Sequence, residues 1–346
     1  MRGLARSANP LHEWRLERAA LRYLGHDLQR PECILAERDG TLWSADARGG
    51  VMRIAADGSQ QFIGQRADAR FASAASGPER YLLQGTLPNG LAFARNGDFL
   101  IANFGSDALE TMTRAGDSRT LHDRIDGLPL GKVNFVLRDS QDRLWLTVTT
   151  RTSPWTRSIN ERLADGYVAL IDERGIRIAA DGFVGTNELR MDANEEWLYV
   201  VETNARRVAR LRVHADGRLS GREVFGPARL RGWPDGCAFD SYGNLWLTYV
   251  ISDQLAAITP QGEELILFDD GDPVALGHYT AHFEAGTVTP EIMMATHGTV
   301  APWMASVTFG GGDLCSCYIG SLRGTTIPWF TAPLAGLPMV HWHERH

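Results

Sequence analysis

The fold is decided by a pattern that stands out in the stretch Asp235–Tyr249, DGCAFDSYGNLWLTY. A polar residue is followed by a short apolar segment, a polar turn and a second apolar segment. The same layout recurs in ECILAERDGTLWSAD from Glu32, NGLAFARNGDFLIAN from Asn89, NFVLRDSQDRLWLTV from Asn134 and NELRMDANEEWLYVV from Asn187. In all five stretches an apolar pair lies 10 and 11 residues after the leading polar residue. Paired apolar segments around a polar turn indicate β-hairpins.

A sixth, degenerate copy, ASVTFGGGDLCSCYIGS, begins at Ala305 and has two additional residues in its turn. The copies begin 45 to 70 residues apart, and each interval holds further strand-like segments such as VMRIAADG and LAAITPQG. Four short strands repeated at about 40–50 residues are typical of propeller blades, and no long segment of helical periodicity competes with them. The sequence therefore predicts an all-β, six-bladed β-propeller of four-stranded blades, in a single domain over residues 1–346.

Four segments lie outside the repeated hairpins, and we expect a different role for the two chain ends than for the two long connections between repeats. Residues 1–30 are expected to supply an outer strand that closes the ring, because closure removes an exposed sheet edge. Residues 335–346, which include HWHERH, are expected to form a frayed polar tail. Segments 64–86 and 149–164 are too long for hairpin turns and are expected to cover a site, with Trp155 as a candidate aromatic lid.

Composition argues against several kinds of partner. The net charge is −7, from 35 basic and 42 acidic residues, and no basic stripe is present, so a nucleic-acid partner is not expected. No apolar run approaches the roughly 18–20 residues of a membrane span, and the N-terminus lacks the apolar region of a signal peptide. Four cysteines without a CxxC motif indicate buried free thiols in a reducing cytoplasm. Nothing in the sequence indicates an oligomeric state.

The leading residues of the six repeats are expected to meet, because the innermost strand of every blade starts at the same height on the central channel. They are Glu32, Asn89, Asn134, Asn187, Asp235 and Ala305. Five of the six carry side-chain oxygens, which suit a hard divalent cation such as Ca²⁺, Mg²⁺ or Mn²⁺. The alternative is that Asn and Asp recur here as turn formers. Glu32 favours a metal site in the channel, since glutamate has no turn preference.

An ordered set of segments covers nearly the whole chain: RPECILAERDGTLWSAD, LPNGLAF, KVNF, GTNELRMD, WPDGCAFDSYGNLWLT and SVTFGGGDLCSCYIGS. In these segments the chain resembles the senescence-marker-protein/gluconolactonase family. The resemblance implies one divalent metal at the channel mouth, held by Glu32, Asn187 and Asp235. Asn134 lies beside that metal, as a ligand or as a substrate contact. Calcium is the expected ion by ligand hardness, with Fe²⁺, Mn²⁺ and Zn²⁺ as alternatives.

The resemblance also implies a gluconolactonase-like hydrolase that opens a small lactone. A metal in such a site polarises the ester carbonyl and activates water. Asp235 is then the candidate base that takes the proton of the water. Lys132, the single lysine in the chain, is the second candidate catalytic residue, as a proton donor or, in a non-hydrolytic reaction, through a Schiff base. It stands where the family has a basic residue that holds substrate oxygens, and the strand period of two places it on the side of Asn134. The candidate substrate contacts are Lys132, Asn134, Asn89, Asn103, Arg151 and Trp155.

Two departures from the family pattern bear on the substrate. The family's substrate-binding glutamate has no counterpart in LTVTTRTSPW, so a cyclic ester less polar than a sugar lactone is expected. The catalytic histidine of the phosphotriesterase-like branch would stand where Ala305 and Ser306 are found, and that branch is therefore not favoured.

Three classes of function remain open. The favoured one is a metal-dependent lactonase, a carboxylic-ester hydrolase with a small-molecule lactone or related carbonyl compound as its partner. The second is an isomerase or lyase that uses the same metal as a Lewis acid on a carbonyl substrate. The third is a propeller that only binds a ligand, as many propellers do. The ring of carboxylates and amides stands against the third.

Overall fold

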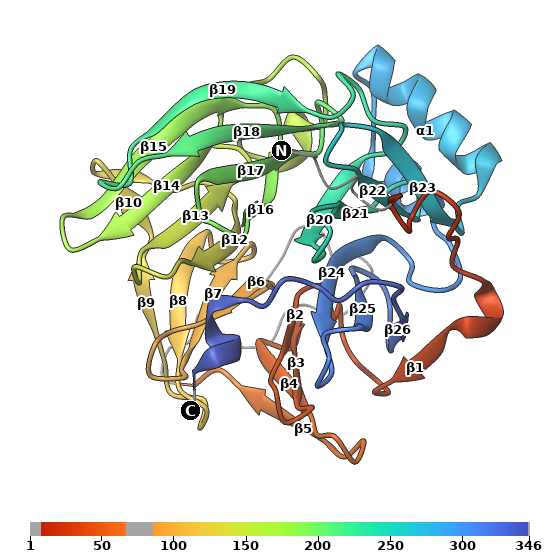
Figure 1. Ribbon diagram of the computed structural model, residues 1–346. Coiled ribbons are helices and arrows are strands. Elements are labelled where there is room, and N and C mark those ends of the chain that lie inside the picture. The colour runs from red at the N-terminus through yellow and green to blue at the C-terminus, as the bar shows by residue number, and fades with distance from the viewer. Residues whose placement is uncertain (1–7, 67–85, 345–346) are drawn as a thin grey trace, which may run out of the picture.

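The computed structural model describes residues 8–66 and 86–344. In these ranges six four-stranded antiparallel sheets are arranged around a central axis (Figure 1). The first strand of each sheet contacts the first strands of its neighbours, so these six strands form the innermost layer. The predicted six-bladed propeller of four-stranded blades is thereby confirmed.

Five blades run outward in chain order, and the sixth takes its outermost strand from the start of the chain. The first three blades are β2 (Ile34–Ala36), β3 (Leu42–Asp46), β4 (Gly50–Ile54) and β5 (Gln60–Gly64); β6 (Pro88–Phe93), β7 (Phe99–Asn103), β8 (Ala108–Met112) and β9 (Ser118–His122); and β12 (Val133–Arg138), β13 (Leu144–Val148), β14 (Gly166–Asp172) and β15 (Gly175–Phe183). The next two are β16 (Thr186–Met191), β17 (Trp197–Glu202), β18 (Arg207–Val213) and β19 (Leu219–Phe225); and β20 (Pro234–Phe239), β21 (Leu245–Tyr249), β22 (Gln254–Ile258) and β23 (Glu264–Asp269). The sixth is β24 (Met304–Gly310), β25 (Ser316–Ser321), β26 (Ile327–Thr331) and β1 (Arg22–Leu24). The described residues also form a small hairpin and short 3₁₀ turns: β10 (Arg124–Ile125), β11 (Leu128–Pro129), η1 (Arg18–Ala20), η4 (Trp155–Ser158) and η5 (Val340–His343).

The sixth blade takes its outer strand from the N-terminal segment. β1 pairs antiparallel with β26, with Arg22 opposite Trp329 and Leu24 opposite Ile327. The outer strand expected from residues 1–30 is supplied by Arg22–Leu24. This pairing ties the start of the chain to the last blade and so closes the ring.

An acidic side chain fixes the inner hairpin turn of three blades. Glu37, Asp139 and Asp240 each accept a hydrogen bond from the indole Nε1 of the tryptophan six residues later, at 2.5, 2.9 and 2.8 Å. Asp240 also accepts three backbone N–H groups of its own turn. The recurring Leu-Trp pair is thus a structural device, because a buried indole needs a partner for its N–H.

Replacing this acid should destabilise the propeller. Asp240→Ala leaves a buried indole N–H and several turn amides unpaired, and we expect a loss of about 2–4 kcal/mol, since hydrogen bonds to charged groups contribute about 1.5–3 kcal/mol each. Chemical denaturation of wild type and variant measures the loss. The control Asp216→Ala removes an exposed turn acid that accepts one backbone N–H, and its unfolding midpoint should stay close to that of the wild type. Equal midpoints for all three proteins would contradict this account of the turn.

Two glycines inside inner strands let neighbouring blades approach near the axis. A Cβ atom at Gly90 would lie 2.6 Å from the Cα atom of Phe135, and one at Gly236 would lie 2.2 Å from the carbonyl oxygen of Ala305. Both glycines lie within strands, β6 and β20, and neither has a positive φ. The Asn-Gly and Asp-Gly dipeptides are therefore not turns here, and the turn interpretation of these two leading residues is wrong.

Two helices that the sequence analysis did not predict lie between β23 and β24. α1 (Pro273–Ala285) starts after Asp272, whose carboxylate accepts two backbone N–H groups, and ends at Gly286, which has a φ of 70°. α2 (Pro290–Ala295) follows. The capping residues are typical of a helix, but only two side chains of α1 are buried, so its apolar periodicity is weak. The inserted pair explains why the last two repeats begin furthest apart. None of the helices in the described part of the chain combines the length and apolar character needed to cross a membrane.

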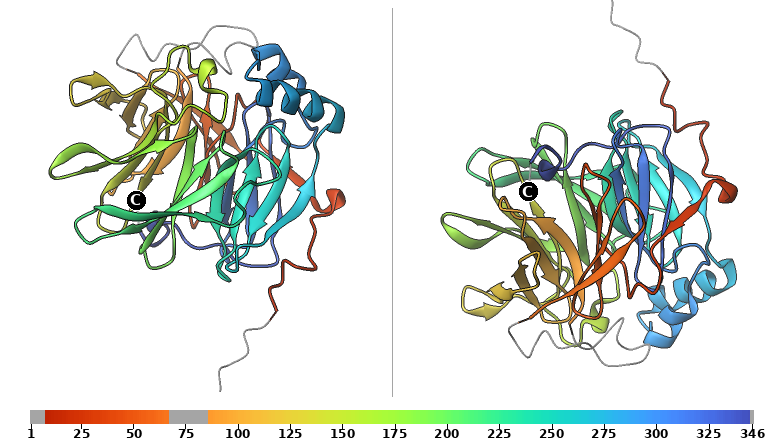
Figure 2. Two further views of the ribbon diagram at one scale, coloured as in Figure 1. Left: turned by 90° about the horizontal axis from the view of Figure 1, so that it is seen from above. Right: turned by 90° about the horizontal axis from the view of Figure 1, so that it is seen from below.

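The C-terminal segment is docked against the ring as far as Glu344. The backbone N–H of Leu337 donates to Phe239 O at 2.8 Å, and the buried His341 ring contacts Ala36 O through Nε2 at 3.0 Å. Glu344 accepts hydrogen bonds from the guanidinium of Arg138. The expectation of a frayed tail is therefore wrong for these residues, because the segment carries apolar and buried side chains. Figure 2 shows the segment on the face of the ring opposite to the two helices.

Acid should weaken this docking through His341. Burial lowers the pKa of His341 to about 4. The unfolded chain, with a histidine pKa near 6.5, therefore binds more protons between pH 6.5 and 4, and stability is lost as the pH falls through that window. At pH 5 the loss is roughly 2 kcal/mol.

The measurement is the free energy of unfolding at pH 7.5 and pH 5 for the wild type and His341→Gln. The difference between the two pH values should shrink in the variant, because glutamine cannot titrate. The exposed His26→Gln serves as control and should keep the wild-type difference. An unchanged pH dependence in His341→Gln would show that His341 does not carry the effect.

Candidate functional site

Five of the six leading residues meet in one cavity of about 100 Å³. Glu32, Asn89, Asn134, Asn187 and Asp235 line it, each at the start of a different inner strand or just before it. All five are at most 9% exposed. The predicted convergence of the leading residues is observed, with Ala305 buried outside the lining set.

Hydrogen bonds orient the polar groups of this cavity. The amide Nδ2 of Asn89 donates to Glu32 Oε1 at 2.9 Å and to Asn134 O at 3.0 Å. The Nδ2 of Asn187 donates to Thr203 Oγ1 at 3.0 Å, so its amide oxygen is turned away from that contact. Three buried oxygens are left without a protein hydrogen-bond partner: Glu32 Oε2, Asn134 Oδ1 and Asn187 Oδ1.

The charges in the cavity are incompletely balanced. Burial raises the pKa of Glu32 and of Asp235 well above the usual range, and the negative charge of Glu188 raises both further. Arg30 opposes the shift at both carboxyls. Glu188 itself pairs with Arg190 at 3.2 Å, and burial raises its pKa to about 7. Because Arg190 is paired with Glu188, Arg30 is the cation that offsets the charge of the two buried carboxylates, Glu32 and Asp235.

The residues present fit a hard divalent cation. Unpaired buried oxygens from one carboxylate and two amides, with a second carboxylate beside them, match the ligand preference of such ions. Glu32, Asn134, Asn187 and Asp235 are the residues that would hold it. Among the described residues, no three His, Cys, Asp or Glu side chains are placed so that they could hold a metal ion without other ligands, so amide ligands are an essential part of this assignment.

The remaining wall of the cavity is largely apolar. Trp155, in the predicted covering segment 149–164, lines it and packs edge-to-face against Phe104 with ring centroids 5.3 Å apart. Tyr279 from α1 and Met293 from α2 close the wall, together with Trp303. The unpredicted helices therefore contribute directly to the site. The other covering segment, 64–86, lies mostly outside the described residues.

Lys132 does not lie where the strand period of two placed it. Its ammonium pairs with Asp107 at 2.8 Å and donates to Phe104 O at 3.2 Å, both on the neighbouring blade, and it is not among the residues that line the cavity. β12 begins only at Val133, and a register shift between Val133 and Phe135 interrupts the alternation of sides. The prediction that Lys132 lies beside Asn134 is therefore wrong, because the strand is not regular at this point.

Two further candidate contacts also point elsewhere. The Asn103 side chain accepts the backbone N–H groups of Leu87, Gly105 and Ser106, so it holds its own loop in place. The Arg151 guanidinium lies over the ring of Tyr167, 4.4 Å from the centroid. Neither lines the cavity.

Sequence reasoning missed Arg30 and Glu188. Arg30 lines the cavity but is one arginine among 34 and precedes the first strand of its blade. Glu188 follows the leading residue Asn187, at a position where two other repeats have glycine. An acidic residue at a glycine position of the repeat was the one signal that pointed to it.

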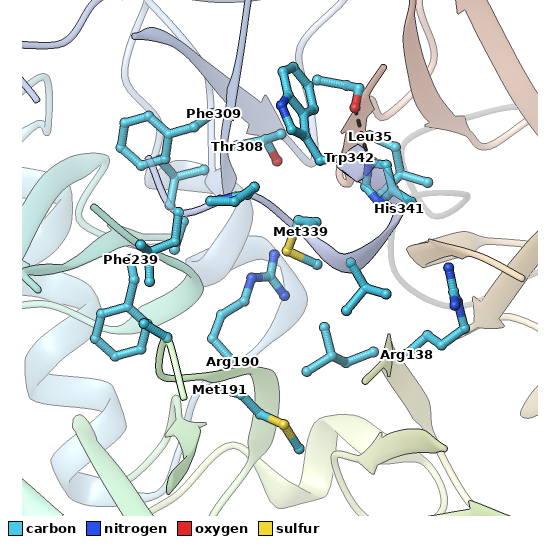
Figure 3. A pocket seen from close by; sticks show the side chains of 18 of the residues that line it. Leu35, Arg138, Arg190, Met191, Phe239, Thr308, Phe309, Met339, His341 and Trp342 are labelled. Carbon is cyan, nitrogen blue, oxygen red and sulfur yellow. Dashed lines mark hydrogen bonds between the residues drawn. The ribbon is translucent and has the colours of Figure 1, made fainter. Parts of the chain in front are cut away.

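A second cavity of about 350 Å³ lies toward the opposite ends of the inner strands. Apolar side chains and the docked C-terminal segment line it, and Figure 3 shows Arg190 pointing toward Met339 in its centre. None of the predicted site residues lies there. The channel is thus divided into an oxygen-lined end and an apolar end that the C-terminal segment covers.

The fold and the cavity together define a six-bladed propeller with an oxygen-lined site at one end of its axis. A sequence model of the SMP-30/gluconolactonase/LRE-like region matches residues 30–268, and the chain belongs to this family. No curated protein matches the chain in sequence.

Solved structures with the same fold are similar over almost their full length. A gluconolactonase from Xanthomonas campestris is 19% identical, with a TM-score of 0.63 over 92% of this chain and 94% of that chain. A luciferin-regenerating enzyme is 15% identical, with a TM-score of 0.65 over 92% and 98%. Regucalcin from Agrobacterium tumefaciens, described as a calcium-binding protein, is 15% identical, with a TM-score of 0.60 over 92% and 96%. At these identities the likeness concerns the fold.

Metal binding to the four assigned residues can be measured directly. Titration calorimetry of chelator-treated protein with Ca²⁺ or Mn²⁺ should give one ion per chain, and the ion should raise the unfolding temperature because it binds only the folded state. Glu32→Gln or Asp235→Asn should weaken binding by more than about tenfold, and Asn134→Ala by less. The control Glu223→Gln changes a half-exposed glutamate on β19 and should bind as the wild type does. If the wild type binds no divalent ion, the assignment is wrong.

Proposed function

We propose that this chain is a divalent-metal-dependent lactonase that opens a small cyclic ester by adding water. The observation that carries the proposal is the group of three unpartnered oxygens beside Asp235 in a buried cavity with an apolar wall. Membership of the SMP-30/gluconolactonase/LRE-like family supports a lactonase-type activity. Calcium is the proposed ion, with Fe²⁺, Mn²⁺ and Zn²⁺ as alternatives.

The residues of the cavity would divide the work between binding and proton transfer. A divalent ion bound there would supply a Lewis acid that polarises the ester carbonyl. Asn89 fixes the orientation of Glu32, and Thr203 fixes that of Asn187, so the oxygens that would hold the ion are kept in place before substrate arrives. Asp235 is the proposed base, which accepts the proton of the attacking water at its carboxylate.

The wall of the cavity favours an apolar substrate. Four polar residues besides the ring of leading residues and Arg30 line it, and each has a side-chain hydrogen bond to the protein: Thr149 to Thr186 O, Ser158 to Trp155 O, Thr203 to Pro234 O and Asn204 to Ser158 O. A sugar lactone would bury several hydroxyl groups against Trp155, Tyr279 and Met293, which offer few partners. A compact lactone with an apolar ring avoids that cost.

Turnover tests the function and the polarity of the substrate together. We expect the metal-loaded protein to hydrolyse hydrophobic γ- and δ-lactones, with at least tenfold higher kcat/KM than for an aldonolactone, measured by proton release. Asp235→Asn should abolish turnover, and the control Glu223→Gln should retain it. A clear preference for the aldonolactone would refute the apolar substrate, and full activity in chelator would refute metal dependence.

The mass of the product separates the proposal from its alternatives. Lactone hydrolysis adds one water molecule to the substrate, whereas an isomerase or lyase that used the same residues would add none. A protein that binds lactones without any product would be the non-catalytic propeller. We also propose a reducing, cytoplasmic setting, because the four cysteines are free thiols and three of them are buried.

A further inference from the structure

Arg30 is the one cationic side chain among the described residues that line the oxygen-rich cavity. It is only 4% exposed, although it lies outside any strand, two residues before Glu32. Lys132, the basic residue that the sequence suggested for the site, is bound to Asp107 on the neighbouring blade. The positive group at the cavity therefore comes from a different blade than expected.

The guanidinium of Arg30 has donors to spare. Its Nη2 donates to Asn89 Oδ1 at 2.5 Å and its Nη1 to Pro88 O at 3.2 Å, while its Nε has no protein partner. A guanidinium carries five N–H donors in a planar fork, so three of the five have no acceptor in the described protein. A planar fork of this kind matches the two oxygens of a carboxylate.

The backbone of Arg30 is held in an uncommon conformation. Its φ is 57°, in the left-handed region that residues other than glycine seldom adopt, and Pro31 restricts it further. Such conformations persist where the surrounding structure imposes them, and they cluster at binding and catalytic sites. Here the conformation accompanies a buried side chain that lines the cavity rather than one directed to solvent.

The charge of the site indicates what Arg30 would recognise. Glu188 and Arg190 neutralise each other, as do Lys132 and Asp107. With a divalent ion bound, Glu32 and Asp235 would be ionised and would contribute two negative charges, and Arg30 contributes one positive charge. A divalent ion on the assigned ligands would then leave the cavity with one net positive charge, which a singly negative ligand would balance.

We propose that Arg30 binds a carboxylate group of the substrate, so that the cavity selects a compact, apolar carbonyl compound carrying one negative charge. For the established fold this adds a recognition residue outside the ring of leading residues. The inference rests on the proposed function for the nature of the reacting group, a lactone carbonyl. It does not depend on turnover, because carboxylate recognition can be measured with ligands that are not hydrolysed.

The test compares two cyclic ketones of equal size, (2-oxocyclopentyl)acetate and its neutral carboxamide, by titration calorimetry on the calcium-loaded protein. Wild type should bind the carboxylate at least about tenfold more tightly than the amide, the scale of one hydrogen bond between charged groups. Arg30→Met, which keeps the length of the side chain, should reduce this preference to within twofold. Arg30→Lys, which keeps the charge and loses the fork, should show an intermediate preference.

Controls keep the result specific to Arg30. Arg212→Met, which removes an exposed arginine on β18, should keep the wild-type preference. Calcium affinity of Arg30→Met should equal or exceed that of the wild type, because a neighbouring positive charge is removed. Loss of calcium binding in that variant would overturn the proposal, since weaker carboxylate binding would then follow from the missing ion.

Other outcomes also decide. Equal binding of the two ketones to wild type, binding of neither, or an undiminished preference in Arg30→Met overturns the proposal. If Arg30→Met fails to fold, the wild-type comparison and Arg30→Lys carry the decision. A carboxylate preference that depends on Arg30, in a protein that hydrolyses no lactone, would support carboxylate recognition and refute the lactonase. Lactone hydrolysis without that preference would do the reverse.

Discussion

The antiparallel pairing of β1 with β26 closes the ring, and the position of every residue in the oxygen-lined cavity depends on that closure. The innermost strands of a closed ring surround a common axis and begin at the same level along it. Residues at the starts of these strands therefore lie close together, although they are far apart in the chain. Glu32 and Asp235 are separated by 203 positions, yet both line the same cavity of about 100 Å³. The first and last blades are also joined directly, because Ser306 Oγ donates to Glu32 O and the backbone N–H of Ser321 donates to Pro31 O.

Closure creates an electrostatic problem that the local structure resolves only in part. Two carboxylates are buried at one end of the axis with Arg30 as their nearest compensating charge, and a third, Glu188, is paired with Arg190 below them. Buried charges are costly unless they are paired or bind metal ions. The side-chain oxygens of Glu32, Asn134 and Asn187 have no hydrogen-bond partner. A divalent ion would bind these oxygens and balance the negative charge of the site.

The two ends of the axis have been covered in different ways. At the oxygen-lined end, α1, α2 and the segment that contains Trp155 provide an apolar wall around the polar ring. At the other end, the C-terminal segment closes a larger, mainly apolar cavity (Figure 3). The additional elements thus lie where the ring alone would expose its interior, and those at the polar end shape what can approach the carboxylates.

The sequence by itself determined the number of blades, the closing N-terminal strand and the set of leading residues, because these follow from a repeated hairpin pattern that is local. It also identified Trp155 through the length of its segment. It did not reveal α1, since few of its side chains are buried and its apolar periodicity is weak. Nor did it reveal the docking of His341, whose partner Ala36 lies 305 positions away.

The orientation of individual side chains was decided only by the tertiary structure. Lys132, just before the register shift in β12, pairs with Asp107, and the left-handed backbone at Arg30 accompanies the burial of a different cation against the cavity. A repeat pattern specifies which residues begin the inner strands, but a one-residue irregularity changes the side to which a neighbour points. The ring of leading residues could therefore be predicted from the sequence, whereas the identity of the cation beside it, Arg30, depended on packing between blades.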